Sequence, residues 1–394
     1  MKNIYILFKF IFLTLFCPRS DTSQIKKIHT ITYRDFSPNG GKGGGSAVQT
    51  CQQLLLGKEY KSLELKYTYF SRNKYFDDWK TRIADLWGGV YFAINNTKNE
   101  RHAVYITHDY GTGFGLALLK KKFIYISHLQ GPKVEEKINF NEHLTSVDKK
   151  IIGFCERYVF KKAFYICFPS LGAKNYYFES NYKSVDESEV KIGPVLYNTL
   201  YIDPEPVKIE NIEKSSDYLT FLSVGALTTA KGIDQIPSFL YEYLQLHKGK
   251  VRWFIVGNGP LKESIESDIE NLKKEFKNLN VTVFNQCQYA EIRYLSKISD
   301  VYIMFHRISI FDLATLEAMN DGKCLVLSKK GGNIDFNRQE NIIFHDGDYC
   351  ETAKSLFNAN ISDLKDLNKK TYDIYFSKEV FVESYKKIIN DLTK

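Results

Sequence analysis

The segment from 301 to 322, VYIMFHRISIFDLATLEAMNDG, carries Ser309 and Asp312 in a short turn and a single acidic residue, Glu317, in the largely apolar run that follows. Its first five residues predict a buried strand, and helical spacing then continues to Gly322, a residue type that commonly ends helices. A helix that begins beyond the carboxyl end of a parallel strand offers free N–H groups to an anion such as phosphate. The segment therefore predicts an anion site with Glu317 just behind it. A second interpretation needs no ligand, because Ser309 and Asp312 have the spacing of a capping box.

Two further turns between a strand and a helix carry glycine, and one of them carries a lysine. In LTFLSVGALTTAKGIDQIP, Gly225 ends a strand and Lys231-Gly232 precedes a helix, so a cation and free N–H groups again lie at a carboxyl strand end. WFIVGNGPLKESI repeats the arrangement at Gly257, with Pro260 at the helix start. These turns favour a diphosphate contact at Lys231, although a purely structural turn remains the alternative for each.

A glycine-rich loop follows the first expected strand, in SPNGGKGGGSAVQT. Five of the six residues from 40 to 45 are glycine, and Gly41 lies near the start of that run. Such a backbone can approach a phosphate closely, but the loop lacks the Gly-Lys-Ser/Thr ending of a P-loop and the third glycine of a dinucleotide fingerprint. It predicts a loop that closes over a substrate, with a surface turn as the alternative.

The elements that must position these residues alternate between short β-branched or aromatic runs and longer helical patterns. This alternation is typical of parallel sheets with crossover helices, so the sequence predicts an α/β protein with two doubly wound, Rossmann-like domains. The expected strands are 27–34, 103–107, 123–128, 164–168, 219–225, 252–256, 281–284, 301–305, 323–328 and 342–344.

The expected organisation has five parts. Residues 1–20 form a hydrophobic N-terminal segment, 21–200 an acceptor-side domain, 201–218 an acidic linker with two prolines, and 219–377 the second domain. The last helix, 378–394, has no strand after it and is expected to pack back on the first domain.

Composition narrows the class of partner and the compartment. Lys and Arg exceed Asp and Glu by 54 − 46 = 8, and the excess is spread along the chain, which suits phosphorylated small molecules, anionic glycans or an acidic membrane surface rather than nucleic acid. The seven cysteines form no CxxC pair and indicate reduced thiols without a structural zinc site. The apolar run at 4–17 is too short to span a bilayer comfortably, and it lacks a small-residue cleavage site. Together with the reduced cysteines this predicts a cytoplasmic protein, with a first segment that is interfacial, an anchor at the inner face of the membrane, or an upstream start that the folded domain does not use.

Taken together, these motifs resemble the family-four retaining glycosyltransferases of the GT-B fold, in which two Rossmann-like domains face each other across a cleft. The resemblance rests on Gly225 with Lys231-Gly232, then IVGNGP, LEAMNDG and NIIFHDGD, and covers about 219–348. The first half resembles bacterial polysaccharide-type members through the glycine-rich loop, THDYGTGFGLALLKKKFIYISHLQGP, and FCERYVFKKAFYICFPSLGA.

The resemblance implies a role for four residues. Lys231 matches the lysine that neutralises the donor diphosphate, and Glu317 matches the second glutamate of a Glu, seven residues, Glu pattern that holds the ribose hydroxyls. Gly41 falls in the loop that approaches the donor, and His128 matches the histidine near the reacting sugar.

Three departures from the family pattern lie in the donor site. The first glutamate of the pair is Ser309, the usual Pro-Ser before it is His306-Arg307, and Ala226 replaces an arginine that often contacts phosphate. Either the site is rebuilt around Ser309, Asp312 and Arg307, or activity is reduced or lost.

The resemblance implies a hexosyltransferase-type glycosyltransferase that moves a sugar from a nucleotide-sugar donor to a glycan or lipid-linked glycan. We expect it to act in assembly of capsule, O-antigen or exopolysaccharide, without a metal or other cofactor, since Asp346-Gly347-Asp348 has the pattern of a turn. The alternatives are a nucleotide-sugar epimerase of the same fold and a non-catalytic GT-B partner subunit.

Overall fold

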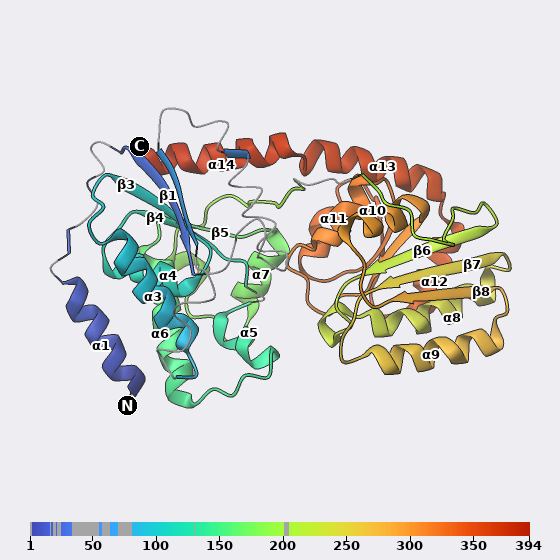
Figure 1. Cartoon of the computed structure of the whole chain (residues 1–394), viewed down its shortest axis with the longest axis horizontal. Helices are drawn as coiled ribbons and strands as arrows, with labels where there is room; N and C mark the ends of the chain where they lie inside the picture. Colours follow the sequence, from blue (N-terminus) through green and yellow to red (C-terminus); the bar gives the residue numbers. More distant parts are fainter. Residues whose placement is uncertain are drawn as a thin grey trace. The chain divides into compact units, whose positions relative to one another are not determined.

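The computed structural model describes residues 2–15, 17–18, 21, 25–33, 55–56, 64–69, 81–129, 131–200 and 205–394 (Figure 1). Gly41 and the glycine-rich loop lie outside the described residues. The chain divides into two compact units, one of Met1–Tyr201 with Lys378–Lys394 and the other of Ile202–Ser377.

The first unit is built on a parallel sheet with strand order β2-β1-β3-β4-β5. This is the flavodoxin-like order, which reverses between β1 and β3. Its strands are β1 (Lys27–Thr32), β2 (Glu64–Tyr69), β3 (Ala103–Thr107), β4 (Phe123–Ile126) and β5 (Tyr165–Cys167). Every residue of β3 and β4 is buried, as expected for strands with both faces covered.

The helices of the first unit precede, connect and cover these strands. They are α1 (Lys2–Thr14), α3 (Ala84–Thr97), α4 (Tyr110–Leu118), α5 (Lys133–Asn139), α6 (Ser146–Lys162), α7 (Leu171–Glu179) and α14 (Lys378–Thr393). Among the described residues, none of the helices is both long enough and apolar enough to cross a bilayer.

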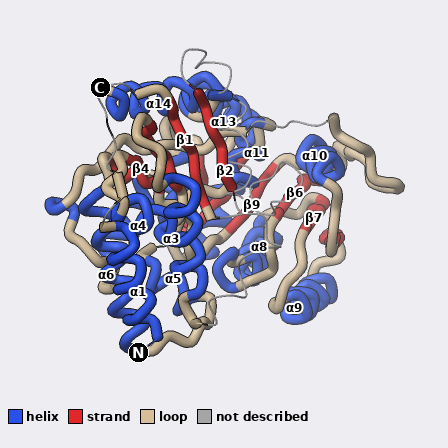
Figure 2. Tube along the Cα trace, turned by 60° about the vertical axis from the view of Figure 1, so that its left-hand side comes forward, coloured by secondary structure: helices blue, strands red, loops and turns tan. Residues whose placement is uncertain are grey.

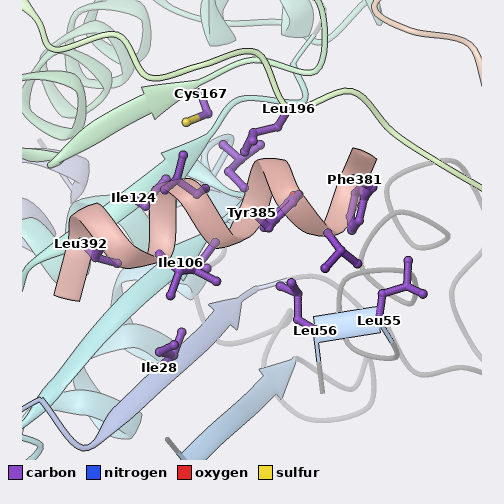
Figure 3. Packing of buried hydrophobic residues seen from close by; sticks show 14 of the residues in the cluster. Ile28, Leu55, Leu56, Ile106, Ile124, Cys167, Leu196, Phe381, Tyr385 and Leu392 are labelled. Atoms are coloured by element: carbon purple, nitrogen blue, oxygen red, sulfur yellow. The ribbon is translucent and has the colours of Figure 1, made fainter. Parts of the chain in front are cut away.

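The last helix, α14, completes the core of the first unit. Its side chains Phe381, Tyr385, Ile388 and Leu392 are at most 3% exposed and join one apolar cluster with strand residues such as Ile106 (Figure 3). The end of the chain therefore supplies one face of a core whose strands come from its beginning.

The second unit holds a six-stranded parallel sheet in the order β11-β10-β9-β6-β7-β8. Read from its other edge, this is the Rossmann order, which reverses between its first and fourth strands, β6 and β9. The strands are β6 (Tyr218–Val224), β7 (Lys250–Val256), β8 (Leu279–Phe284), β9 (Val301–Met304), β10 (Cys324–Ser328) and β11 (Ile342–His345).

The helices of the second unit alternate with its strands. They are α8 (Ile236–Leu246), α9 (Lys262–Glu275), α10 (Tyr289–Ile298), α11 (Leu313–Asn320), α12 (Tyr349–Asn358) and α13 (Ile361–Tyr375), with short 3-10 turns at Thr229–Lys231, Ile233–Gln235 and Gly331–Phe336.

The predicted fold class, two doubly wound α/β domains, is confirmed. All ten expected strands form, with boundaries that shift by a few residues at most. The eleventh described strand, β2, was not predicted, although ELKYTY alternates polar and apolar residues with the period of a strand.

Candidate functional site

The candidate site lies at the carboxyl ends of β6 and β9, which are hydrogen-bonded neighbours in the second unit. The chain leaves β6 through residues 225–232 and leaves β9 through residues 305–312. The strand order reverses between these two strands, so their connections run to opposite faces of the sheet, and open α/β sheets bind ligands at such a reversal. Lys231, Asp312 and Glu317 all belong to the elements that follow these two strands.

A glycine lets the two loops come into contact. Gly232 has a φ of 67°, and a Cβ at this position would lie 1.8 Å from the carbonyl oxygen of Phe305. The backbone N–H of Arg307 donates to the oxygen of Ala230 at 2.9 Å, and the Gln235 amide donates to the same Phe305 oxygen at 2.7 Å. The loop after β6 is thereby fixed on the loop after β9, which places Lys231 over the start of α11.

Lys231 forms an ion pair with Asp312 across the two loops. The Lys231 Nζ lies 2.5 Å from Asp312 Oδ1, and His306 Nε2 lies 3.4 Å from the lysine nitrogen and 3.5 Å from the same carboxylate oxygen. His306 and Asp312 are almost fully covered, whereas 32% of the Lys231 side chain is exposed. One cation of this cluster is thus accessible to a ligand.

The charges of the cluster support each other. Burial alone would raise the pKa of Asp312, but the positive charge of Lys231 and hydrogen bonds from Lys231 and His306 outweigh it and hold that pKa well below its usual range. Burial lowers the pKa of His306 despite the nearby carboxylate, so the imidazole is neutral at physiological pH. The cluster contains one cation and one anion.

Asp312 is also the N-cap of α11. Its Oδ2 accepts hydrogen bonds from the Thr315 backbone N–H at 3.0 Å and from the Thr315 hydroxyl at 3.1 Å. The capping-box interpretation, in which Ser309 is the N-cap, is therefore wrong, because the N-cap lies three residues later, at Asp312. The expected anion position at this helix start contains a carboxylate that belongs to the chain itself.

Ser309 instead belongs to a buried hydrogen-bond network beneath the loop. Its hydroxyl donates to Asn333 Oδ1 at 2.8 Å, and the Asn333 amide donates to the Ser328 carbonyl at 3.1 Å. The Ser328 hydroxyl in turn donates to the His306 carbonyl at 2.6 Å. Ser309 is only 8% exposed, so its most direct effect is on the shape of the loop that presents Asp312.

Glu317 lies one and a half turns into α11, on the same helix as the Asp312 cap. The Tyr289 hydroxyl donates to Glu317 Oε1 at 2.8 Å. Burial raises the pKa of Glu317 to about 7 despite this hydrogen bond and the charge of Arg293, so a substantial part of the population is protonated at neutral pH.

Arg307 and Gly257 both contact the chain that follows β6. The guanidinium of Arg307 binds both carboxylate oxygens of Asp234, at 2.8 and 2.7 Å, and the carbonyl of Thr229. Gly257 follows β7, and a Cβ there would lie 1.9 Å from the carbonyl oxygen of Gly225. Gly257 therefore supports the loop after β6 through its backbone.

His128 belongs to the first unit, just beyond β4. Its Nε2 lies 3.0 Å from Nδ1 of His108, and the two rings are stacked with centroids 5.1 Å apart. His108 follows β3 in the same way, and the next residue, Asp109, caps α4 and accepts from the backbone N–H of Tyr33. Of these two histidines only His128 was predicted from the sequence as a site residue, although both follow closely after a strand.

The residues that the structure describes contain no group of three or more His, Cys, Asp or Glu side chains that could hold a metal ion. In the Asp346-Gly347-Asp348 segment, Gly347 has a φ of 99° and Asp348 caps α12. Both features are those of a turn.

The second unit matches a known family. The family described as "Glycosyl transferases group 1" matches residues 205–370, which include the whole candidate site. No curated protein matches the chain.

Solved structures resemble the chain over both units. Sucrose-phosphate synthase from Thermosynechococcus elongatus has a TM-score of 0.64 at 14% identity, covering 93% of this chain and 99% of that one. Anabaena HepE in complex with UDP and glucose has a TM-score of 0.61 at 11% identity, covering 93% and 100%. A mutant of S. aureus TarM in complex with UDP has a TM-score of 0.53 at 14% identity, covering 78% of this chain, which spans only 59% of the TarM chain.

These likenesses confirm the fold inferred from the strand orders, and the family match covers the unit in which Lys231, Asp312 and Glu317 lie. The chain therefore has the GT-B fold, and its residues 205–370 match the group 1 glycosyl transferases.

Proposed function

We propose that this protein is a retaining hexosyltransferase-type glycosyltransferase that moves a sugar from a nucleotide-sugar donor to a glycan or lipid-linked glycan acceptor in surface polysaccharide assembly. The observation that carries the proposal is the position of Lys231, which lies over the start of α11 at the strand reversal of the second unit. A partly exposed cation and a helix N-terminus suit a diphosphate.

In the proposed complex, the donor diphosphate competes with the Asp312 carboxylate for Lys231. Asp312 retains its hydrogen bonds from Thr315, which allows Lys231 to turn toward the phosphate without uncapping the helix. Glu317 accepts hydrogen bonds from the ribose hydroxyls in its ionised form. Arg307 already has a carboxylate partner in Asp234, so the main contact with the diphosphate is assigned to Lys231.

The chemistry that follows is electrostatic. As the bond between the sugar and the diphosphate breaks, negative charge grows on the departing oxygen, and Lys231 with the α11 N–H groups stabilises it. The acceptor hydroxyl forms the new glycosidic bond and releases its proton to the departing phosphate. This sequence requires no metal ion.

Two further observations support parts of the proposal. HepE and TarM, which share the fold, were solved in complexes with UDP, and UDP is the nucleotide product of a UDP-sugar donor. Cys155, Cys167 and Cys324 are buried free thiols, which suits the reducing cytoplasm where we place the reaction.

The test is thermal stability in the presence of UDP, GDP, ADP and their sugar conjugates. A ligand that binds only the folded state raises the melting temperature. We expect one nucleotide to stabilise the wild type but neither Lys231→Ala nor Glu317→Ala. The matched controls are Lys248→Ala and Glu266→Ala, which change an exposed and a partly exposed residue of the same unit and should respond as the wild type does.

Product analysis then separates the proposed reaction from its rivals. Transfer to an added acceptor with retention at the anomeric carbon supports the proposal, whereas conversion of the donor sugar without acceptor indicates an epimerase. Failure of every nucleotide to stabilise the wild type favours a non-catalytic partner subunit. The ion pair that engages Lys231, together with Ser309 in place of a glutamate, is what favours this second candidate.

A further inference from the structure

One side of α1 is packed on the first unit. Ile6 and Phe10 are 4% and 1% exposed, and the Phe10 ring stacks on Trp87 of α3 with centroids 6.2 Å apart. Asn3 accepts a hydrogen bond from the Trp87 indole at 2.9 Å and donates to Asp148 of α6 at 2.8 Å. The helix α1 thus lies alongside α3 and α6 (Figure 2). These contacts determine which side of α1 faces away from the first unit.

The opposite side of α1 is exposed and aromatic. Tyr5 is 71% exposed, and Phe8 and Phe12 are each 65% exposed. At 100° per residue, these three side chains lie on one stripe roughly opposite Ile6 and Phe10. A helix on the surface of a globular protein normally has polar residues there, so this stripe indicates a partner with an apolar interior.

The charges of α1 are all positive. Lys2 and Lys9 are exposed and lie together on one flank of the aromatic stripe, and α1 contains no Asp or Glu. An amphipathic helix with aromatic residues beside lysines is typical of binding in the interface of a lipid bilayer.

A basic groove begins next to the N-terminal end of α1. Lys149 and Lys150 directly follow Asp148, the residue that Asn3 binds, and they line a groove of about 410 Å³ together with Arg157 and Lys183. The lining includes no carboxylate. Arg157 pairs with Glu189 and Lys183 with Asp186, but within the described part of the chain Lys149 and Lys150 have no ion pair. Two cations of the groove are thus available to a bound anion.

We propose that the first unit docks on an anionic lipid surface. In this arrangement, the aromatic stripe of α1 lies among the upper acyl chains, and Lys2, Lys9, Lys149 and Lys150 bind the phosphate groups of the lipids. Ile6 and Phe10 are packed on the first unit, so only the opposite side of α1 is free to enter lipid, and the helix lies along the membrane surface in this arrangement.

A second copy of this chain is a poorer occupant of the stripe. Two α1 helices that met along it would bring lysines together with no acidic residue of α1 to pair with them. The charge pattern therefore selects negatively charged lipid. This inference does not depend on the proposed glycosyl transfer.

The experiment is cosedimentation of the full chain with vesicles. We expect the wild type to pellet with vesicles of phosphatidylglycerol and phosphatidylcholine in equal parts, to stay largely in solution with phosphatidylcholine alone, and to be released by salt. Phe8→Ser with Phe12→Ser should weaken binding about tenfold or more, because each change removes an aromatic ring from the lipid. Lys149→Glu with Lys150→Glu should abolish the preference for anionic lipid.

Matched controls exist in the second unit. Phe357→Ser removes a phenylalanine of α12 that is 48% exposed. Lys273→Glu with Lys274→Glu reverses the charge of two adjacent lysines on α9. Both controls should bind vesicles as the wild type does, and circular dichroism should show all variants folded.

Three results would overturn the proposal. The first is a wild type that pellets with neither vesicle. The second is a pair of test variants that bind as well as the controls do. The third is a lipid-free dimer that Phe8→Ser with Phe12→Ser converts to monomer, which would make a second copy the occupant of the stripe. A Tyr5→Trp variant adds a direct readout, because its fluorescence should shift to the blue with anionic vesicles only.

Discussion

The ion pair between Lys231 and Asp312 decides how the candidate site behaves at the scale of single residues. Asp312 combines two tasks, since one of its oxygens binds the lysine and the other caps α11. The same carboxylate therefore orders the lysine before a donor binds and opposes the arrival of a second anion. A change that removes the charge of Asp312 should therefore lower the stability of the protein while it raises the affinity for the nucleotide.

Asp312→Asn is expected to raise nucleotide affinity and lower stability. Asparagine still caps the helix, but it no longer neutralises Lys231, whose side chain is 32% exposed. Without ligand we expect a loss of about 1 to 2 kcal/mol in the free energy of unfolding, less than for a fully buried pair. Removing a negative charge near the bound diphosphate should tighten nucleotide binding by about fivefold or more.

Calorimetric titration and thermal unfolding measure the two effects of Asp312→Asn. The control is Asp348→Asn, in which the N-cap of α12 loses the same charge at the end of edge strand β11. Weaker nucleotide binding in Asp312→Asn would mean that Asp312 contacts the donor directly.

Glu317 should make donor binding depend on pH. Its raised pKa of about 7 means that the carboxylate, the better acceptor for ribose hydroxyls, becomes populated as the pH rises through neutrality. Affinity for the nucleotide sugar should therefore increase about three- to tenfold from about pH 6 to about pH 8. Titrations of wild type and Glu317→Gln against pH check this, and an equally steep profile in the variant would contradict it.

The positions of the site residues could be predicted from sequence, whereas their contacts could not. Lys231 and Asp312 each stand in a strand, turn and helix pattern, which places them at a carboxyl strand end whatever the rest of the chain does. The two residues are 81 positions apart in the chain, and their pairing depends on the approach of two loops. The assignment of the cap to Ser309 failed for the same reason, because Asn333 binds its hydroxyl only in the folded unit.

At the scale of elements, hydrophobic runs identified ten strands because buried parallel strands are nearly continuous apolar stretches. β2 was not predicted because its residues alternate between polar and apolar, as ELKYTY, and its partner residues in β1 lie 37 positions earlier in the chain. Strand order depends on pairing between distant segments, so the sequence predicted two doubly wound domains, and the order of the strands came from the structure.

The contact between the two loops of the site should depend strongly on Gly232. Gly232→Ala forces a non-glycine residue to a φ near 67° and places its Cβ against the Phe305 carbonyl. Gly322→Ala is the matched control, since Gly322 has a φ of 61° but a nearest neighbour 3.3 Å from the added Cβ. We expect a cost of about 1 kcal/mol at Gly322 and about 3 kcal/mol or more at Gly232.

Thermal unfolding and nucleotide binding measure this difference. Gly232→Ala should also lose nucleotide affinity, because the loop that presents Lys231 must move. Equal destabilisation by the two alanines would show that the backbone angle alone matters and that the loops readily separate.

At the scale of the molecule, the first unit should depend on the last residues of the chain. Ile388 of α14 is fully buried against β-strand side chains of that unit, so Ile388→Ala should cost about 2 to 5 kcal/mol. Its exposed neighbour gives the control, Lys387→Ala, with an expected change within about 0.5 kcal/mol.

Hydrogen exchange can locate the effect of Ile388→Ala. Amides of β1, β3 and β4 should exchange faster, while those of β6 and β9 in the second unit should keep their wild-type rates. Faster exchange throughout both units would mean that the whole chain unfolds as one cooperative body.

The place of α14 also imposes an order on synthesis. The segment that forms the second unit, Ile202–Ser377, is complete when it leaves the ribosome, but the first unit still lacks a helix of its own core. At ordinary elongation rates, the 394 − 201 = 193 residues that follow Met1–Tyr201 take about 10 to 40 s to make. For that interval the nascent chain presents uncovered strands such as β3 and β4 to chaperones, and the half made first is the half that matures last.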